Sequence, residues 1–404
     1  MELSKDFKQT EAGVLPQDWD CSPLVGKIHI AHGFAFQGEY FTPDGDFLLT
    51  TPGHFYESGG FRDIGDKQKY YSGPIPKGYV LEKDDVIVAM TEQADGLLGS
   101  TAIIPENGKY LHNQRLGRLK PISKEISLQY LYWVFNSKYY RSKVRETAAG
   151  TKVKHTSPNK LLEIHVPIPK TKMEQEAIAN ALSDADVYIE SLETLIAKKR
   201  LIKKGVMQEL LTGKRRLHGF KKGWSKKPLG EIADVIMGQS PLSSFYNTYG
   251  AGVPLIQGNA DIVDRKTIQR VYTTNITKKG FAGDILLTVR APVGAVAKAT
   301  FECCLGRGVC AIRNSEDFLY HALIAKESEW SSLSKGSTFD SVNSLEVKNF
   351  LIDYPSDKDE RNLITEIISG IVLDLVKSEE KLSKVRLLKQ GMMQELLTGR
   401  IRLV

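Results

Sequence analysis

Residues 203–217 read KKGVMQELLTGKRRL and residues 389–403 read KQGMMQELLTGRIRL, so 11 of 15 positions are identical at a separation of 186 residues. The same offset, carried backwards without a gap, pairs further identical residues: Pro169 with Pro355, Glu174 with Glu360, Ile178 with Ile364, Ser183 with Ser369, Glu193 with Glu379, Lys198 with Lys384, and Arg200 with Arg386. A repeat of this length indicates one supersecondary unit that the chain uses twice.

Both copies of the repeat carry the pattern of a long helix. Apolar residues recur at intervals of four and three, which is typical of a coiled-coil seam, although Lys199 interrupts the first series. Each helix is predicted to run about 39 residues, roughly 58 Å, and to end at the glycine of LLTG. The predicted seam consists of Ile178, Leu182, Ile189, Leu192, Ile196, Ile202, Val206 and Leu210 in the first copy, and of Ile364, Ile368, Leu375, Leu382, Val385, Leu388, Met392 and Leu396 in the second.

Two similar helices bury similar seams most simply by packing on each other, and an approximate two-fold axis between the halves makes them antiparallel. The alternative is that each helix packs on its own neighbouring domain. Gly205 and Gly391 lie inside the helical pattern, where glycine costs stability, and indicate either close packing or a bend.

The segments between the helices share a skeleton. Both open with Trp-x₃-Pro-Leu, at Trp19 and Trp224, and continue with short β-type runs: 46–55 and 84–90 in the first half, 253–259 and 283–299 in the second. Helical segments at 127–144 and 317–333 follow, each leading to a glycine loop, at 148–157 and 334–344. We therefore predict an α+β fold with two mostly antiparallel β modules. The expected domains are a first module with an N-terminal arm at 1–158, a helical spacer at 159–217, a second module at 218–344 and a second spacer at 345–404.

The composition is that of a soluble globular protein of 404 residues, too long for one core. No signal peptide and no membrane-spanning run is recognisable, so a cytoplasmic location is expected. The net charge of +7 is mild, with contributions of 11 − 8 = +3 from residues 159–217 and 15 − 11 = +4 from 218–344. This charge permits contact with phosphates without requiring it. The four cysteines lack zinc-site spacing and are expected to be free core thiols.

We find no catalytic motif: no phosphate loop, dinucleotide fingerprint, H-E-x-x-H or G-x-S-x-G. Asp340, Glu346 and Lys348 loosely imitate the carboxylate and lysine set of a metal-dependent nuclease, but a solvated surface is the simpler interpretation. No cofactor or metal site is therefore expected in this chain.

The two modules carry different polar side chains on one skeleton. Aligning the second on the first places Asp284 on Asp85, Arg290 on Thr91, Arg307 on Arg115 and Gln257 on Thr50. Such differences are expected when two modules of one fold recognise different base edges. The candidate DNA-binding residues are Thr50, Thr91, Arg115, Lys152, Lys154 and His155 in the first module, and Gln257, Asn259, Arg290, Arg307, Ser337 and Thr338 in the second.

The alternation of variable module and repeated helix resembles the specificity subunit of type I restriction-modification systems. The resemblance rests on the tryptophan openings, on the loops GTKVKHTS and GSTFDSVNS that lead to PIPKTKMEQEAI and YPSDKDERNLI, and on the twice-used QELLTG. It covers nearly the entire chain. One departure is that Glu174-Gln175 of the first helix start becomes Glu360-Arg361 in the second.

The resemblance implies that the modules are target recognition domains, each reading one half of a bipartite, asymmetric double-stranded DNA site. The helices would act as a ruler for the gap between the halves. Two adenine methyltransferase subunits using S-adenosylmethionine would dock on this chain, restriction subunits would join them, and this chain would not be an enzyme. The alternatives are a self-contained DNA nuclease or methyltransferase, and a coiled-coil scaffold without a DNA role.

Overall fold

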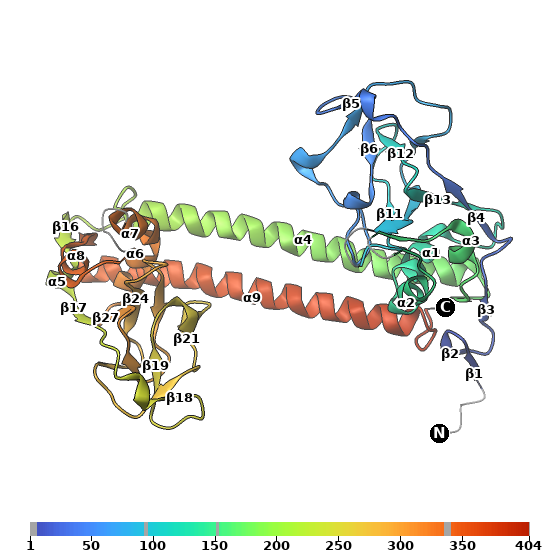
Figure 1. The fold of residues 1–404 in the computed structure, drawn as a ribbon. Coiled ribbons are helices and arrows are strands. Elements are labelled where there is room, and N and C mark those ends of the chain that lie inside the picture. The colour runs from blue at the N-terminus through green and yellow to red at the C-terminus, as the bar shows by residue number, and fades with distance from the viewer. Residues whose placement is uncertain (1–5, 93–95, 151–152, 335–340, 404) are drawn as a thin grey trace. The chain divides into compact units, whose positions relative to one another are not determined.

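The structure, a computed structural model, describes residues 6–92, 96–150, 153–334 and 341–403. The chain divides into two compact units, a first unit of Met1–Leu192 with Lys381–Val404 and a second unit of Glu193–Glu380. Two helices of 39 residues, α4 (Lys172–Leu210) and α9 (Lys358–Leu396), each contribute one part to either unit (Figure 1). The predicted helix length is confirmed.

Equivalent residues set the ends of both helices. The Thr171 hydroxyl accepts a hydrogen bond from the backbone N–H of Glu174 (3.2 Å), and the carboxylate of Asp357, 186 residues later, accepts one from the N–H of Asp359 (3.0 Å). These side chains satisfy N–H groups that lack a partner at a helix start. After the last turns, Gly213 and Gly399 adopt φ values of +70° and +66°, the left-handed conformation that ends a helix.

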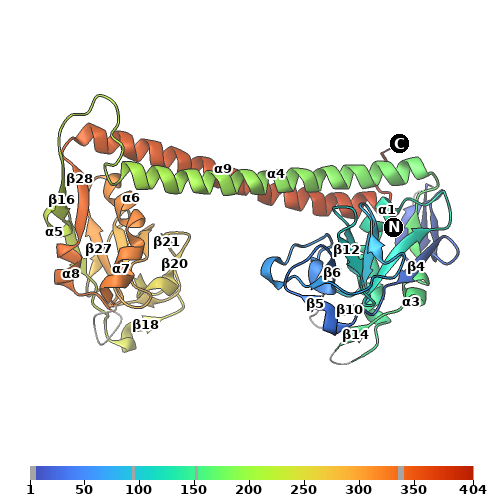
Figure 2. The same ribbon diagram turned by 90° about the horizontal axis from the view of Figure 1, so that it is seen from above.

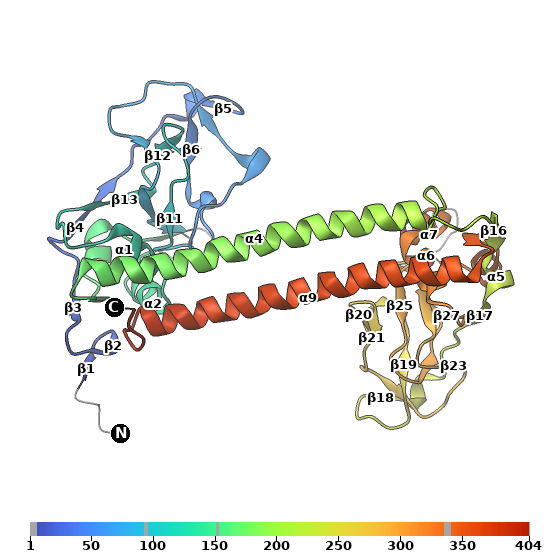
Figure 3. The same cartoon turned by 180° about the vertical axis from the view of Figure 1, so that it is seen from behind.

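The first unit contains two main sheets. One is antiparallel in the order β11 (Thr101–Ile103), β9 (Val86–Ala89), β13 (Leu116–Pro121), β4 (Ile28–His32). The other has the order β5 (Phe41–Thr42), β7 (Tyr70–Tyr71), β6 (Leu48–Thr50), β12 (Tyr110–His112), β8 (Val80–Leu81), and its β6 and β12 are parallel. Figure 3 shows β5, β6 and β12 in the first unit.

Smaller elements complete the first unit. Three two-stranded sheets pair β1 (Phe7–Thr10) with β2 (Gly13–Pro16), β3 (Asp20–Ser22) with β15 (Val166–Ile168), and β10 (Thr91–Glu92) with β14 (Lys154–His155). The helices are α1 (Leu128–Phe135), α2 (Lys138–Glu146) and α3 (Pro158–Leu162), with 3₁₀ turns η1 (Gly38–Tyr40), η2 (Pro52–His54) and η3 (Gly65–Lys67).

The second unit repeats this plan. Its larger sheet has the order β17 (Asp234–Met237), β27 (Val309–Arg313), β24 (Ile285–Thr288), β25 (Val296–Lys298), β21 (Lys266–Thr267), β20 (Ile262–Val263). The other has the order β18 (Tyr246–Asn247), β22 (Tyr272–Thr273), β19 (Val253–Ile256), β26 (Cys303–Leu305), β23 (Lys279–Gly280).

The pair β16 (Trp224–Pro228) and β28 (Leu351–Pro355) lies beside two short helices, α5 (Leu229–Ile232) and α8 (Ser344–Asn349) (Figure 2). The remaining elements are α6 (Asp317–Ala325), α7 (Glu327–Ser334), η4 (Ser243–Phe245) and η5 (Asn259–Asp261). The prediction of two mostly antiparallel β modules with two long helices is thus confirmed.

The helices are part of the core of each unit. In the first unit Ile178, Leu182 and Leu396 pack with the buried side chains of β4, β9, α1 and α2. In the second unit Met207 and Ile364 pack with those of β24, β27 and α6. The three cysteines of the second module are buried and free, as expected, and burial raises the pKa values of the Cys303 and Cys310 thiols to about 12.

Within each unit α4 and α9 are antiparallel. In the second unit Lys199 of α4 contacts Asp374 of α9 (2.7 Å), whereas Arg216, further along the chain from α4, contacts Glu360 at the start of α9 (2.7 Å). In the first unit Asp186 contacts Lys389, whereas the earlier Glu174 contacts Arg402 beyond the end of α9. Residue numbers therefore rise along one helix as they fall along the other.

The seam differs from the prediction at two positions. Ile202 and Leu388 are 57% and 63% exposed, so their assignment to the helix seam is wrong. The interval pattern continues instead through lysines: Leu192, Ile196, Lys199, Lys203, Val206 and Leu210 in α4, and Ser378, Leu382, Val385, Lys389, Met392 and Leu396 in α9. Lysine buries its apolar stem along such a seam while its ammonium group reaches a polar partner. Lys199, for example, bonds to Asp374 and Ser378.

Of the other predicted seam residues, Ile178, Leu182, Leu192, Ile196, Leu210, Ile364, Ile368, Leu375 and Leu396 are buried, and Ile189, Val206, Leu382, Val385 and Met392 are half-buried. A Cβ atom at Gly205 or Gly391 would meet no atom of the described residues within 4 Å. Close packing therefore does not explain these two glycines.

The residues after each LLTG form a clasp with the start of the other helix. Arg216 donates to both oxygens of the fully buried Glu360 (2.7 and 2.9 Å), to which the Trp224 indole also donates (3.2 Å). In the first unit Arg402 donates to the buried Glu174 (2.8 Å) and lies 5.8 Å from the centre of the Trp19 ring. These contacts explain why the repeat extends beyond the helices.

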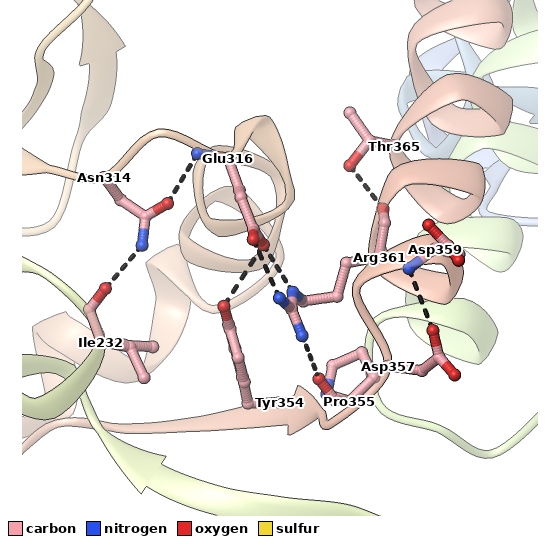
Figure 4. Close-up of polar contacts among 9 residues, drawn as sticks. All are labelled: Ile232, Asn314, Glu316, Tyr354, Pro355, Asp357, Asp359, Arg361 and Thr365. Atoms are coloured by element: carbon pink, nitrogen blue, oxygen red, sulfur yellow. Dashed lines mark hydrogen bonds and ion pairs between the residues drawn. The ribbon is translucent and has the colours of Figure 1, made fainter. Parts of the chain in front are cut away.

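The departure in the repeat, Gln175 against Arg361, preserves the same contact in both units. The Gln175 amide donates to the carbonyl of Pro169 (3.2 Å), and Arg361 donates to the carbonyl of the equivalent Pro355 (2.7 Å). Figure 4 shows Arg361 also holding the carboxylate of Glu316, at the start of α6 (2.8 Å). Gln175 instead accepts from the N–H of Ser127, at the start of α1 (2.9 Å).

Candidate nucleic-acid interface

In the first module, Thr91 and Arg115 lie at the same edge of the β9–β13 sheet, because Thr91 follows β9 and Arg115 directly precedes the antiparallel β13. Thr91 pairs with His155 between β10 and β14. The backbone N–H of Met90, directly before Thr91, donates to the carbonyl oxygen of Arg115 (3.0 Å). Arg115 and His155 are exposed and Thr91 is half-buried. The sheet thus brings three of the predicted DNA-binding residues together.

A cavity of about 590 Å³ opens beside Thr91 and Arg115. Its lining contains three cations, Lys67, Lys69 and Arg115, and no carboxylate among the described residues. Its apolar wall includes the rings of Phe36 and Phe41, and its polar groups include Thr51, Thr91, His54 and Gln114. A concave, acid-free surface with cations and amides suits a polyanion whose base edges offer hydrogen-bond acceptors.

Four residues of the cavity were not predicted from the sequence: Thr51, Lys67, Lys69 and Gln114. Lys67 and Lys69 are two residues apart near the η3 turn, a weak charge signal that sequence alone does not connect to Arg115. The cavity also includes His54, whose Nδ1 accepts from the N–H of Thr51 (3.1 Å). Burial lowers the pKa of His54, so the ring is neutral at pH 7.

In the second module, Gln257, Arg290 and Arg307 form the corresponding edge. All three are exposed. The backbone N–H of Val289, directly before Arg290, donates to the carbonyl oxygen of Gly308 (2.9 Å). The N–H of Gly306 donates to the carbonyl oxygen of Ile256, directly before Gln257 (2.8 Å). Arg290 pairs with Ser341 as Thr91 pairs with His155. Asn259 is exposed two residues beyond Gln257, at the start of η5.

Shared hydrogen bonds show which residues of the two modules correspond. The Asp85 carboxylate accepts from the N–H of Glu82 (2.8 Å) and that of Asp284 from the N–H of Phe281 (2.9 Å). Both aspartates also pair with an arginine, Arg118 or Arg313. This agrees with the predicted alignment of Asp284 on Asp85.

Two other alignments were wrong by one residue. The N–H before Thr91 donates to Arg115 as the N–H before Arg290 donates to Gly308, so Gly308 corresponds to Arg115 and Arg307 to Gln114. Because Gly308 corresponds to Arg115, Cys304 corresponds to Leu111. Leu111 pairs with Leu49 and Cys304 with Leu255, both in parallel strands, so Gln257 lies on Thr51 rather than on Thr50. Since side chains on a strand alternate between faces, a shift of one residue moves a side chain to the other face.

Thr50 is accordingly fully buried and has no place at the surface. The Lys154 ammonium lies 3.7 Å from the carboxylate of Glu92. This carboxylate accepts hydrogen bonds from the N–H groups of residues 96–98, so Lys154 lies beside the side chain that holds that loop. Lys152, Ser337 and Thr338 lie outside the described residues.

The loose nuclease-like set does not form a site among the described residues. Asp340 lies outside them, and the Glu346 carboxylate accepts from the N–H of Asn343 (2.7 Å) as part of the cap of α8. In the described part of the chain there is no group of three or more histidine, cysteine or acidic side chains that could hold a metal ion. No helix within those residues is long and apolar enough to cross a membrane.

Two modules of one framework, each carrying different polar side chains at the same edge, define a protein with two distinct recognition surfaces. The chain belongs to the family of type I restriction modification DNA specificity domains, which matches residues 16–199 and 221–385.

Relatives match this chain over different lengths. A putative type I restriction enzyme MjaX specificity subunit from Methanocaldococcus jannaschii is 27% identical over 98% of this chain and 97% of its own length. The EcoBI specificity subunit of Escherichia coli is 28% identical over 42% of this chain and 31% of its own length.

Solved structures share the fold. The S subunit of a type I restriction-modification system from M. genitalium has a TM-score of 0.62 at 16% identity, covering 98% of both chains. The HsdS subunit from Thermoanaerobacter tengcongensis has a TM-score of 0.53 at 22% identity, covering 96% of this chain and 98% of its own.

Proposed function

We propose that this chain is the DNA-reading subunit of a type I restriction-modification complex and that its modules read the two unlike halves of a bipartite, asymmetric site. The observation that carries the proposal is the difference in side chains at equivalent positions of one framework. Thr51, Thr91 and Gln114 of the first module correspond to Gln257, Arg290 and Arg307 of the second. Arginine, glutamine and threonine distinguish base edges in the major groove by their donor and acceptor patterns.

The test is an exchange of residues 218–344 for the corresponding segment of another specificity subunit, followed by sequencing of the methylated DNA. One half of the methylated sequence changes and the other stays, because each module reads its half independently. A matched exchange of residues 1–158 changes the opposite half. If both halves change together, or neither does, the proposal is wrong.

The partners in this proposal are two copies of an adenine methyltransferase subunit, through which restriction subunits join. Support comes from apolar residues that are exposed at equivalent positions of both helices: Val187 and Leu373, Leu201 and Leu387, and Ile202 and Leu388. The ion pair of Asp186 with Lys389 places Val187 level with Leu388 in the first unit, and that of Lys199 with Asp374 places Ile202 level with Leu373 in the second. Each unit thus has exposed apolar residues of both helices at one level along the helix pair.

In this proposal the chain has no active site, and S-adenosylmethionine binds to the methyltransferase partner. The purified chain is incubated alone with DNA, magnesium and S-adenosylmethionine, and neither cleavage nor methylation is expected. Activity without the partner subunits would support a self-contained enzyme instead. Binding without sequence preference, measured at low and moderate salt with the methyltransferase present, would support a scaffold.

A further inference from the structure

Next to the DNA-reading edge of the second module, a leucine is held in solvent. Leu242 precedes η4 and is 72% exposed. A large apolar side chain in water forgoes the free energy of burial. Leu242 lies beside the proposed DNA-reading residues, where a bound duplex would cover it.

The loop that carries Leu242 is fixed to the reading edge. The Ser240 hydroxyl accepts from the backbone N–H of Arg307 (3.0 Å). The Tyr246 hydroxyl donates to the carbonyl of Pro241 (3.1 Å) and accepts from the Gln257 amide (3.4 Å). Two hydrogen bonds in series therefore connect the Gln257 side chain to the residue directly before Leu242.

The first module contains the same turn with a polar residue. Gln37 precedes η1 as Leu242 precedes η4, and the strands β5 and β18 follow the two turns. Gln37 is also exposed. Exposure at this position belongs to the framework, whereas the apolar side chain belongs to the second module alone. A feature specific to one module fits a role in reading that module's half of the DNA better than a role in a contact shared by both.

We propose that Leu242 and Gln257 together read one A·T base pair, with the Gln257 amide on the adenine edge and the Leu242 side chain on the thymine methyl group. In the major groove an amide pairs with N6 and N7 of adenine, and the methyl group of the paired thymine is the apolar feature of the same base pair. The hydrogen bonds from Gln257 through Tyr246 to Pro241 connect the two residues, and the major groove that their side chains would enter is about 12 Å wide. This inference rests on the proposed DNA-reading function.

The test uses the chain assembled with its methyltransferase subunits and a duplex carrying its methylation site. Each thymine of the half-site read by the second module is replaced in turn by uracil, which removes the methyl group and keeps the base pairing. We expect one replacement to weaken binding about fourfold, the loss expected for one methyl group left unburied. Leu242→Ser weakens binding by a similar factor and abolishes the sensitivity to that uracil, whereas Gln257→Ala relaxes the preference for A·T at the same position.

Leu351→Ser is the matched control, because Leu351 is an exposed leucine of the second unit on the β16–β28 sheet, outside the reading edge. It leaves both affinity and uracil sensitivity unchanged. The inference is overturned if Leu242→Ser keeps the uracil sensitivity of the unaltered chain, or if no A·T pair responds to Gln257→Ala. Arg307→Ala separates this outcome from failure of the proposed function: it weakens specific binding if the second module reads DNA at all.

Discussion

At the scale of single residues, the repeat changes from Gln175 to Arg361 without losing its contact. Both side chains donate to the proline carbonyl before the helix, and both hold the start of a module helix. Glutamine bonds to backbone groups there, whereas arginine requires a carboxylate, which Glu316 provides. In each of the two copies the residue at this position therefore matches its partner in the module.

We expect Arg361→Gln to lower the free energy of unfolding by about 2 kcal/mol at pH 7, since a charged hydrogen bond to a mostly buried group is lost. Arg361 holds the pKa of Glu316 below its ordinary value. The stabilisation is therefore present above the pKa of Glu316 in the unfolded chain and is lost as the pH falls through the lowered folded value. Urea unfolding at several pH values from 7 to 3 should show the difference between variant and parent shrinking toward low pH.

Arg200→Gln serves as the control, because it removes the same functional group from an exposed ion pair with Glu379 in the same unit. Its effect should stay below about 0.5 kcal/mol. Equal losses in the two variants would contradict the importance assigned to the Glu316 contact.

The candidate DNA-reading edges could be predicted from the sequence only in part. The framework and the residue types at the edge could be predicted, since Thr91, Arg115, Gln257, Arg290 and Arg307 all lie there. The residues of the first module that correspond to Gln257 and Arg307 could not be predicted, because loops of unequal length separate the strands and a one-residue error exchanges a buried for an exposed side chain. Cavity residues such as Lys67 come from a different loop, which only the folded sheet brings near Arg115.

At the scale of elements, the helices contain glycines that nothing in the packing requires. We expect Gly205→Ala and Gly391→Ala each to stabilise the chain by about 0.5–1 kcal/mol, because alanine loses less conformational entropy in a helix and its Cβ meets no neighbour. The midpoint of urea unfolding measures this gain.

Gly213→Ala is the matched control with the opposite sign. Gly213 has a φ of +70°, and an added Cβ would lie 3.0 Å from the Trp224 ring. This variant should lose stability. A loss in Gly205→Ala as well would mean that the helix departs from regular geometry at that point.

The helices were the most predictable elements, because two copies of one sequence pattern indicate both the length of each helix and most of the residues on its buried face. The seam was wrong only at Ile202 and Leu388, where an apolar residue directly precedes a seam lysine. The spacing of apolar residues predicts the isoleucine or leucine for the seam. In the folded chain the lysine takes that position, because its apolar stem packs in the seam and its ammonium group contacts an acidic or aromatic partner. Lys389, for example, lies 4.8 Å from the centre of the Trp133 ring.

The same exposed residues carry a prediction about docking. Leu201→Ser with Ile202→Ser removes the apolar surface of the second unit, and Leu387→Ser with Leu388→Ser removes that of the first. Neither pair is buried, so we expect both variants to fold normally. Native mass spectrometry with the methyltransferase subunit should show two bound copies for the parent, one for either variant and none for the combination.

Leu195→Ser is the control for docking, because Leu195 is exposed on α4 and the equivalent position in α9 is Lys381. A surface used by two equal partners requires the same chemistry in both copies, which Leu195 lacks. This variant should therefore still bind two methyltransferase subunits. Two bound copies in the combined variant would place the docking surface elsewhere.

At the scale of the whole molecule, both units contain parts of the same two uninterrupted helices. Each unit is closed by its own clasp and core, and each holds one of the two proposed DNA-reading edges. The modules are therefore free to vary as long as the helix starts and ends keep their contacts. In the proposed function, the helices are the part that relates one half of the DNA site to the other.

Lengthening α4 and α9 together tests this role. Seven residues inserted into each helix at the boundary of the units add about 10.5 Å and preserve the seam, which repeats every seven residues. At about 3.4 Å per base pair, the unread gap in the methylated sequence should grow by about three base pairs while both halves stay the same. Inserting seven residues into α4 alone should instead misalign the seam and lower the urea midpoint. If the paired insertion folds and methylates DNA with an unchanged gap, the helices do not set the spacing.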